Sequence, residues 1–226
     1  MKVGVLLSGC GVQDGSEVYE SVLTILALER AGAEVAAIAP DVPQAEVINH
    51  YRGTELRTGE SGGPQRSVLA ESARIVRGKI ASLTEVSAHD LDALIIPGGF
   101  GVVNNLCNYA TKGADATVNA DVKKIIVGIN ALGKPIGALC IAPVLVALCL
   151  GDKAPAVTIG SDAKTAVDLQ RFGASHHQTG VADIYTDEAN SIVSTPAFML
   201  AQSAVEAEAG ITKLVNKVLE LAKALQ

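Results

Sequence analysis

The sequence predicts an α/β protein in which helices cover both faces of a mostly parallel β-sheet. Short apolar runs alternate with amphipathic stretches along all 226 residues, which is the pattern of strands alternating with helices. Hydrophobic residues make up 49% of the chain but aromatic residues only 3%, so the core is expected to be aliphatic, as in buried parallel sheets. We find no repeat or linker, and therefore expect one domain over residues 1–226.

Strands are predicted where a short apolar run ends at a glycine, a proline or a polar turn. In chain order these runs cover residues 3–7, 35–39, 78–83, 91–96, the residues after Pro135, 157–159, 181–185 and 191–194. The last two are expected to form a hairpin around residues 187–190.

Helices are predicted where apolar residues recur at three- and four-residue spacing. They cover residues 17–31, 68–75, 121–132, 142–150, 195–202 and 211–225. Asp14 or Ser16 is expected to cap the first helix, and Gly32 follows its last turn, where glycine commonly ends a helix. Residues 44–63 have no clear period and are interpreted as an excursion over the sheet.

Charge and hydropathy exclude several classes of partner. The net charge of −6 argues against nucleic acid and anionic membranes. No apolar run approaches 18 residues, and Met1 leads into a strand rather than a signal peptide. The sequence therefore predicts a cytoplasmic protein, or one of the mitochondrial matrix if a presequence has been removed.

Cys140 stands between the strand after Pro135 and the helix over residues 142–150. A side chain on such a turn lies at the sheet edge, beside helix N–H groups. This setting is expected to lower the thiol pKa and favour a nucleophilic thiolate, although most free cysteines simply pack as small apolar residues. Cys107 and Cys149 are interpreted as packing residues. The four cysteines show no C-x-x-C pair, and no metal site is predicted.

Three unusual segments each follow a predicted strand: residues 8–20, residues 97–105 and the segment from Cys140 onward. Ligands bind at the carboxyl ends of strands in open α/β sheets. If these strands are parallel neighbours, the three segments converge on one pocket. The first segment nearly matches the dinucleotide motif G-x-G-x-x-G, but Asp14 replaces its third glycine, so no cofactor is predicted.

Glu17 and Glu20 lie one turn apart at the start of the first predicted helix. Acidic residues there can simply favour the helix dipole. Alternatively, one of them meets Cys140 and shares a proton with it, because two adjacent anions are unfavourable. A protonated glutamate donating to the thiolate is the expected arrangement.

The glycine-rich turn after residue 96 is predicted to complete the pocket, although such clusters are also ordinary turns. The backbone N–H groups of Gly99 and Ile141 are the expected donors to an oxyanion. Gly98 and Phe100 are expected to line the binding site, with Cys10, Tyr19 and Asn105 at its rim. The pair His176-His177 is interpreted as a surface feature.

Several segments together resemble the ElbB family, within the PfpI-like branch of the class I glutamine-amidotransferase-like superfamily. They are Ser8-Gly-Cys-Gly-Val-Gln-Asp-Gly-Ser-Glu17, Arg66-Ser-Val-Leu-Ala-Glu-Ser-Ala-Arg74, Ile95-Ile-Pro-Gly-Gly-Phe-Gly101, Gly133-Lys-Pro-Ile-Gly137, Cys140-Ile-Ala-Pro143 and Ser194-Thr-Pro-Ala-Phe-Met199. The resemblance implies a flavodoxin-like three-layer sandwich, a homodimer and Cys140 as an elbow nucleophile. It implies Glu20 as the carboxyl that partners Cys140, with Glu17 as the alternative.

Relatives with protease or amidotransferase activity carry a histidine after the cysteine or near the end of the domain. Here Ile141 follows Cys140, and Gly160-Ser161-Asp162 occupies the stretch where another branch has its histidine. The resemblance therefore implies a cofactor-independent glyoxalase, acting on methylglyoxal or glyoxal, rather than a glutaminase or peptidase. The alternatives are a redox or metabolite sensor and an accessory interaction protein that retains the same pocket.

Overall fold

The computed structural model describes residues 1–55 and 65–225, so the excursion predicted over residues 44–63 lies partly outside the described residues. Seven strands form one sheet in the order β10-β11-β7-β6-β1-β2-β5. All neighbours are parallel except β10, which runs antiparallel to β11, and this confirms the mostly parallel sheet. The strands of this sheet are β1 (Lys2–Leu6), β2 (Glu34–Ala39), β5 (Ala81–Ser82), β6 (Ala93–Ile96), β7 (Ile136–Leu139), β10 (Tyr185–Asp187) and β11 (Ile192–Thr195).

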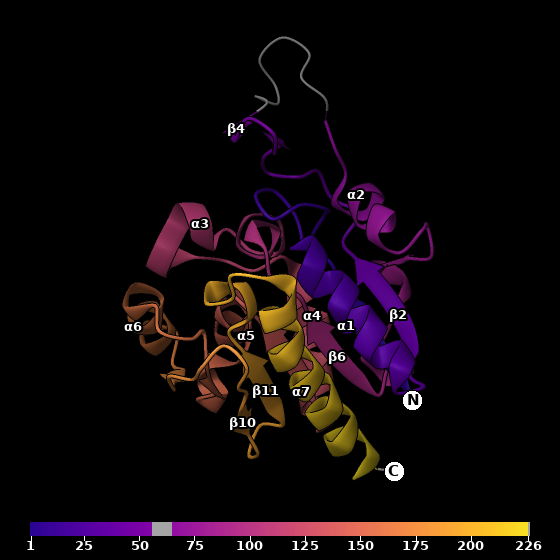
Figure 1. The fold of residues 1–226 in the computed structure, drawn as a ribbon, viewed down its shortest axis with the longest axis vertical. Coiled ribbons are helices and arrows are strands. Elements are labelled where there is room, and N and C mark those ends of the chain that lie inside the picture. The colour runs from indigo at the N-terminus through magenta and orange to yellow at the C-terminus, as the bar shows by residue number, and fades with distance from the viewer. Residues whose placement is uncertain (56–64, 226) are drawn as a thin grey trace.

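Helices cover both faces of this sheet, as predicted (Figure 1). They are α1 (Val18–Arg30), α2 (Val68–Ile75), α3 (Tyr109–Lys112), α4 (Ala120–Ala131), α5 (Ala142–Leu150), α6 (Ala163–Arg171) and α7 (Ala204–Lys223). Successive strand residues point to opposite faces. Leu94 and Ile96 of β6 therefore pack in the core with α4 and α5, whereas Ala93 and Ile95 pack in the core with α1 and α7. No helix of the described residues is long and apolar enough to cross a membrane.

The three central strands bring the unusual segments together. β7, β6 and β1 are adjacent and parallel, so their carboxyl ends meet at one edge of the sheet. β1 leads into residues 8–17, β6 leads into residues 97–101, and β7 leads into Cys140. The predicted convergence is therefore confirmed.

The carboxyl-terminal region departs from the prediction in three places. The strand expected over residues 181–185 instead spans Tyr185–Asp187, and it forms the predicted hairpin with β11. The helix expected over residues 195–202 is wrong: only a 3-10 turn, Ala197–Met199, forms there. Ala197 has a positive φ of 43°, which a right-handed helix does not allow. The last helix begins at Ala204 rather than 211, because Ser203 caps it by accepting a hydrogen bond from the Glu206 N–H.

Smaller elements differ as well. The strand expected over residues 157–159 is β8 (Ala156–Val157), which lies outside the main sheet and pairs with β9 (Ser175–His176). A second pair, β3 (Ile48–Asn49) and β4 (Thr54–Glu55), lies in the excursion. Of the run predicted over residues 78–83, only β5 is a strand, and helix α6 was not predicted at all.

Neither Asp14 nor Ser16 caps α1. Glu17 is the cap, and its carboxylate accepts a hydrogen bond from the Glu20 N–H at 2.7 Å. The other two side chains instead hold the loop before the helix. The Ile48 N–H donates to Asp14 Oδ2, and the Ser8 N–H donates to Ser16 Oγ.

Candidate active site at Cys140

Cys140 lies in a strained turn between β7 and α5. Its φ is +57°, in the left-handed region that residues other than glycine rarely adopt. The turn is held because the Cys140 N–H donates to the Thr195 carbonyl of β11 at 3.0 Å, and because α5 begins with Pro143 in its first turn. The side chain is 9% exposed. This is the geometry of a nucleophile elbow.

Glu20 is the carboxyl in contact with the sulfur. It is fully buried, and the Cys140 thiol hydrogen-bonds to it. Two backbone groups orient the carboxylate, with the Gly98 N–H donating to Oε2 at 2.7 Å and the Phe198 N–H donating to Oε1 at 3.1 Å. Glu17 is 8% exposed and lines the adjoining cavity. Glu20 therefore contacts the sulfur, whereas Glu17 faces the cavity beside it.

Burial determines the ionisation of this pair. It raises the pKa of Glu20 to about 7, even though the N–H groups of Phe198 and Gly98 favour the carboxylate. Burial, followed by the charge of Glu20, also raises the pKa of the Cys140 thiol well above its ordinary value. The expected lowering of the thiol pKa is therefore wrong, because burial and the carboxylate charge outweigh two N–H groups. The proton stays on sulfur, and the thiol donates to the carboxylate rather than the reverse.

The two predicted oxyanion donors both face the sulfur, since the N–H groups of Gly99 and Ile141 hydrogen-bond to Cys140. Glycine is required in the turn after β6, which carries the first of these donors. A Cβ on Gly98 would lie 2.5 Å from Cys140 Cβ, and one on Gly99 would lie 2.3 Å from the Gly15 carbonyl oxygen. Gly99 also has a φ of +100°. The turn after β6 therefore approaches both the nucleophile and the loop before α1.

A cavity of about 610 Å³ opens beside the sulfur. Its lining residues are Val12, Glu17, Gly99, Phe100, Val103, Tyr109, Ala110, Gly113, Cys140, Ile141, Asp162, Lys164, Thr165, Asp168, Phe198 and Met199. Of the predicted oxyanion and binding residues, Gly99, Phe100 and Ile141 are among them, whereas Gly98 is not and instead donates its N–H to Glu20. No histidine is among these described residues, and no group of three potential metal ligands occurs in the described part of the chain.

The three residues expected at the rim do not line this cavity. Asn105 is a structural residue: its amide donates to the carbonyls of Ser8 and Asp14, and its Oδ1 accepts from the Ala45 N–H. Tyr19 is 59% exposed and its ring lies 6.0 Å from that of Phe198.

Cys10 lies on the loop after β1. Burial and the charge of Glu71 raise its pKa, while Arg74 lowers it, which places the thiol beside this ion pair rather than beside Cys140.

Phe198 and the wall formed by α3 and α6 were missed from the sequence. Phe198 belongs to a segment noted for its resemblance to the family, but the segment was predicted to be helical. On the opposite wall, the Tyr109 hydroxyl donates to Asp168 at 2.7 Å, and Arg171 pairs with the same carboxylate. These residues are distant from Cys140 in sequence, and no local pattern connects them to it.

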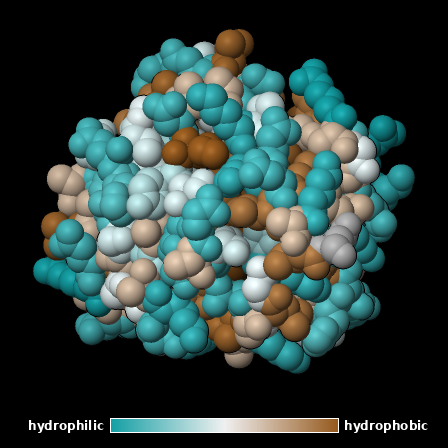
Figure 2. All heavy atoms as spheres, turned by 90° about the horizontal axis from the view of Figure 1, so that it is seen from below, coloured by the Kyte–Doolittle hydropathy of each residue, from teal (hydrophilic) through white to brown (hydrophobic). Residues whose placement is uncertain are grey.

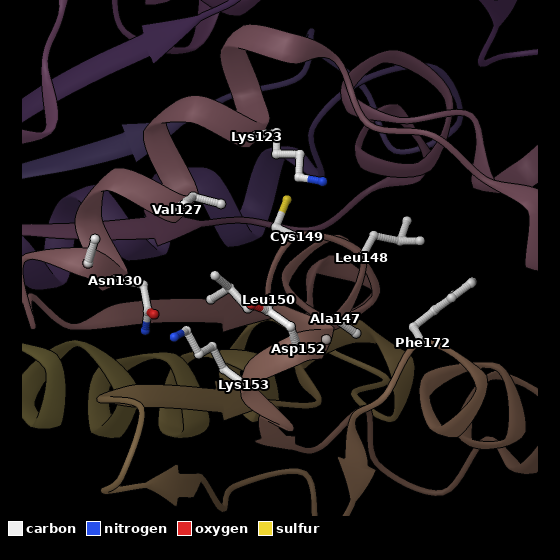
Figure 3. Close-up of a pocket in the computed structure, with 12 residues that line it drawn as sticks. Lys123, Val127, Asn130, Ala147, Leu148, Cys149, Leu150, Asp152, Lys153 and Phe172 are labelled. Atoms are coloured by element: carbon white, nitrogen blue, oxygen red, sulfur yellow. The ribbon is translucent and has the colours of Figure 1, made fainter.

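A second cavity, of about 840 Å³, lies at the far end of α5 (Figure 3). Lys123 of α4 extends toward Cys149, and Lys153 lies on the other side of the cavity. Burial raises the pKa of Cys149 to about 12, which agrees with its interpretation as a packing residue. Cys107 is buried as well, with a pKa raised to about 11.

Comparisons with known proteins agree with this arrangement. The chain is 44% identical over 229 residues to the ES1 protein homolog, mitochondrial, of Rattus norvegicus, covering 97% of this chain and 84% of that protein. It is 43% identical over the same length to glutamine amidotransferase-like class 1 domain-containing protein 3, mitochondrial, of Homo sapiens, covering 97% of this chain and 83% of that protein.

Among solved structures, the fold matches an isoprenoid biosynthesis protein with an amidotransferase-like domain from Ehrlichia chaffeensis. The TM-score is 0.88 and the identity 31%, over 98% of this chain and 99% of that one. The model of the DJ-1/PfpI family matches residues 9–176, which include the loop after β1, the glycine turn and Cys140. The chain therefore belongs to the DJ-1/PfpI family.

Proposed function

We propose that this protein is a cofactor-independent glyoxalase of the ElbB type, which converts methylglyoxal or glyoxal to the corresponding hydroxy acid. One observation carries the proposal: the Cys140 thiol hydrogen-bonds to a buried carboxyl whose pKa is raised to about 7, with two backbone N–H groups on the same sulfur. This arrangement combines a nucleophile, a base able to accept its proton near neutral pH, and donors for an oxyanion.

In the proposed reaction, Cys140 Sγ adds to the aldehyde carbon while Glu20 accepts the thiol proton. The proton then passes to the aldehyde oxygen, which gives a hemithioacetal. Glu20 next removes the C–H proton of the former aldehyde carbon and returns it to the neighbouring carbon through an enediol, while the hydroxyl proton passes from the first oxygen to the second. The first carbon is thereby oxidised and the second reduced, with no external oxidant. Water hydrolyses the resulting thioester and restores the thiol.

The charge that develops on oxygen requires donors that are already in place. The N–H groups of Gly99 and Ile141 already point to the sulfur, and we propose that they hold the oxyanion of each addition step. An aldehyde loses no amine during the reaction. A histidine that protonates a leaving group is therefore unnecessary, and this favours aldehydes over amides for a cavity whose described lining contains no histidine.

A peroxide sensor is supported less well by the site. Oxidation requires a thiolate that is accessible to the oxidant. Burial raises the Cys140 pKa and leaves the side chain 9% exposed, and both features oppose this reaction. The accessory-protein alternative predicts a dispensable Cys140, which the experiment below tests.

Further assignments belong to this proposal. The chain acts as one domain, as a homodimer, without a cofactor or metal. It takes a small carbonyl metabolite rather than nucleic acid or a membrane. Because the relatives from rat and human are named as mitochondrial proteins, we place it in the mitochondrial matrix, or in the cytoplasm where no presequence accompanies it.

The first test is the formation of lactate from methylglyoxal without glutathione. We expect Cys140→Ala to abolish turnover, because the nucleophile is lost. The matched control is Cys149→Ala, which removes a buried thiol at the second cavity, from the helix that follows Cys140, and should retain the activity of the wild type. Equal lactate formation by the wild type and Cys140→Ala would contradict the proposal and favour the accessory role.

A further inference from the structure

The cavity beside Cys140 is large for a three-carbon aldehyde. Methylglyoxal has five non-hydrogen atoms, which displace roughly 150 Å³ if each occupies about the 30 Å³ of a water molecule. The cavity volume is about 610 Å³. Sites of roughly 300–1,000 Å³ commonly enclose ligands of drug size. Most of the space therefore remains once methylglyoxal is bound to the sulfur.

Three of the residues that line the cavity are apolar and adjoin the site residues in sequence or by hydrogen bond. Ile141 follows Cys140 directly, Phe100 follows the oxyanion donor Gly99, and Phe198 supplies the N–H that orients Glu20. The chain contains only three phenylalanines, and two of them line this cavity. Phe100 is 56% exposed, so its ring is accessible to a ligand that enters the cavity.

Apart from Glu17, the charged lining groups are Asp162, Lys164 and Asp168, which lie on or beside α6. Asp168 is already satisfied by Tyr109 and Arg171, and Asp162 accepts a hydrogen bond from the Thr165 N–H at 2.7 Å. Two carboxylates and the single amine of Lys164 leave this side with a net negative charge, which disfavours an anionic substituent, whereas the aromatic wall attracts an apolar one. The charge distribution therefore favours a substrate that is apolar next to its reacting carbonyl.

We propose that the site selects 2-oxoaldehydes with an extended apolar substituent over methylglyoxal, and that Phe100, Phe198, Met199 and Ala110 form the subsite for that substituent. This inference rests on the proposed function and specifies its substrate class. A four-carbon extension of the methyl group, as in 2-oxoheptanal, is short enough for the remaining volume.

The test compares kcat/KM for 2-oxoheptanal and methylglyoxal, with Cys140→Ala subtracted as the background. Four additional buried methylene groups should raise kcat/KM at least tenfold. Ala110→Trp fills the subsite from an exposed position on α3 and should lower the ratio of the two kcat/KM values at least fivefold. The matched control is Ala114→Trp, on an exposed residue outside the cavity lining, which should leave the ratio unchanged.

A second measurement separates this inference from the proposed function. Calorimetry would compare the dissociation constants of the product acids 2-hydroxyheptanoate and lactate. Tighter binding of 2-hydroxyheptanoate than of lactate, weakened by Ala110→Trp, supports the subsite. If neither aldehyde is turned over but this binding preference is present, the glyoxalase proposal is rejected and the subsite stands. Equal binding of the two acids, or a kcat/KM ratio at or below one, overturns the subsite. A ratio insensitive to Ala110→Trp would also overturn it.

Discussion

At the scale of residues, the site depends on one proton shared between Cys140 and Glu20. Both groups are buried, so neither anion is well solvated, and the pKa values of both are raised. Because the carboxyl of Glu20 is a stronger acid than the thiol of Cys140, the carboxyl loses its proton first as the pH rises. The resting pair above neutral pH is therefore a thiol donating to a carboxylate, which is ready to accept the proton when the sulfur attacks.

The pH dependence of activity follows from this order of ionisation. Lactate formation should rise as the pH passes through about 7, where the Glu20 carboxylate forms. Glu20→Gln should lower kcat/KM by roughly 10²- to 10⁴-fold and remove the rise. Glu29→Gln, on an exposed residue of the same helix, is the matched control. A wild-type rise that survives in Glu20→Gln would reject Glu20 as the base.

The free energy of unfolding should fall over the same pH range in which the activity rises. The folded pKa of Glu20 lies above its ordinary value of 4.5, so the folded protein binds this proton more tightly than the unfolded chain. The resulting stability is complete below pH 4.5 and is lost as the pH rises toward 7. A rise from 4.5 to about 7 corresponds to about 3 kcal/mol in the free energy of unfolding.

Urea denaturation measures this effect. From pH 4.5 to 8, the wild type should lose up to about 3 kcal/mol of unfolding free energy relative to Glu20→Gln, whose side chain does not titrate. The amide accepts only one of the two N–H groups that the carboxylate accepts, which lowers the stability of the variant at every pH. A constant difference between the two proteins across this range would contradict a raised Glu20 pKa.

At the scale of elements, the glycine turn after β6 joins three segments of the chain. The Glu17 N–H donates to the Gly98 carbonyl, and the Gly101 N–H donates to the Gly15 carbonyl. The same turn supplies the Gly98 N–H to Glu20. Displacement of the turn would therefore move the carboxyl and the oxyanion donor together.

Gly99→Ala should show this coupling. Its Cβ would lie 2.4 Å from the Glu17 nitrogen, and the backbone also has a positive φ, so we expect a loss of roughly 2–4 kcal/mol in stability and a large loss of kcat. Gly32→Ala is the matched control, because Gly32 has a φ of +72° but no atom within 4 Å of the added Cβ. It should cost about 1 kcal/mol and leave kcat unchanged. Unchanged kcat in folded Gly99→Ala would show that the turn does not position the site.

At the scale of the whole molecule, the edge of the sheet opposite Cys140 is held separately. The Lys134 amine, just before β7, donates to the carbonyls of Ala88, His89 and Leu91, in the segment that leads into β6. It thereby connects the starts of the two strands whose other ends carry Cys140 and the glycine turn.

Viewed from below, the molecule shows apolar residues in several separate groups among polar ones (Figure 2).

Lys134→Met should therefore separate stability from catalysis. Loss of hydrogen bonds from a charged amine should cost about 2 kcal/mol in the free energy of unfolding. The kcat of the folded protein should stay close to that of the wild type, since the contacts at Cys140 are unchanged. Lys124→Met, on an exposed residue of α4 that makes no hydrogen bond or ion pair with the described residues, is the control. A stability equal to that of Lys124→Met would show that the amine does not hold this edge.

The sequence by itself determined the layered fold, the convergence at β1, β6 and β7, and the elbow at Cys140. These features follow from local patterns, namely apolar runs, helical spacing and glycine or proline at the ends of elements. Local sequence does not distinguish Glu17 from Glu20 as the partner of Cys140, because residues three apart share one helix face. Only the tertiary structure decided that Glu20 contacts the sulfur, that burial raises both pKa values, and that Phe198 and α6 complete the cavity. Desolvation and distant contacts arise when the layers pack, so no short segment of sequence contains them.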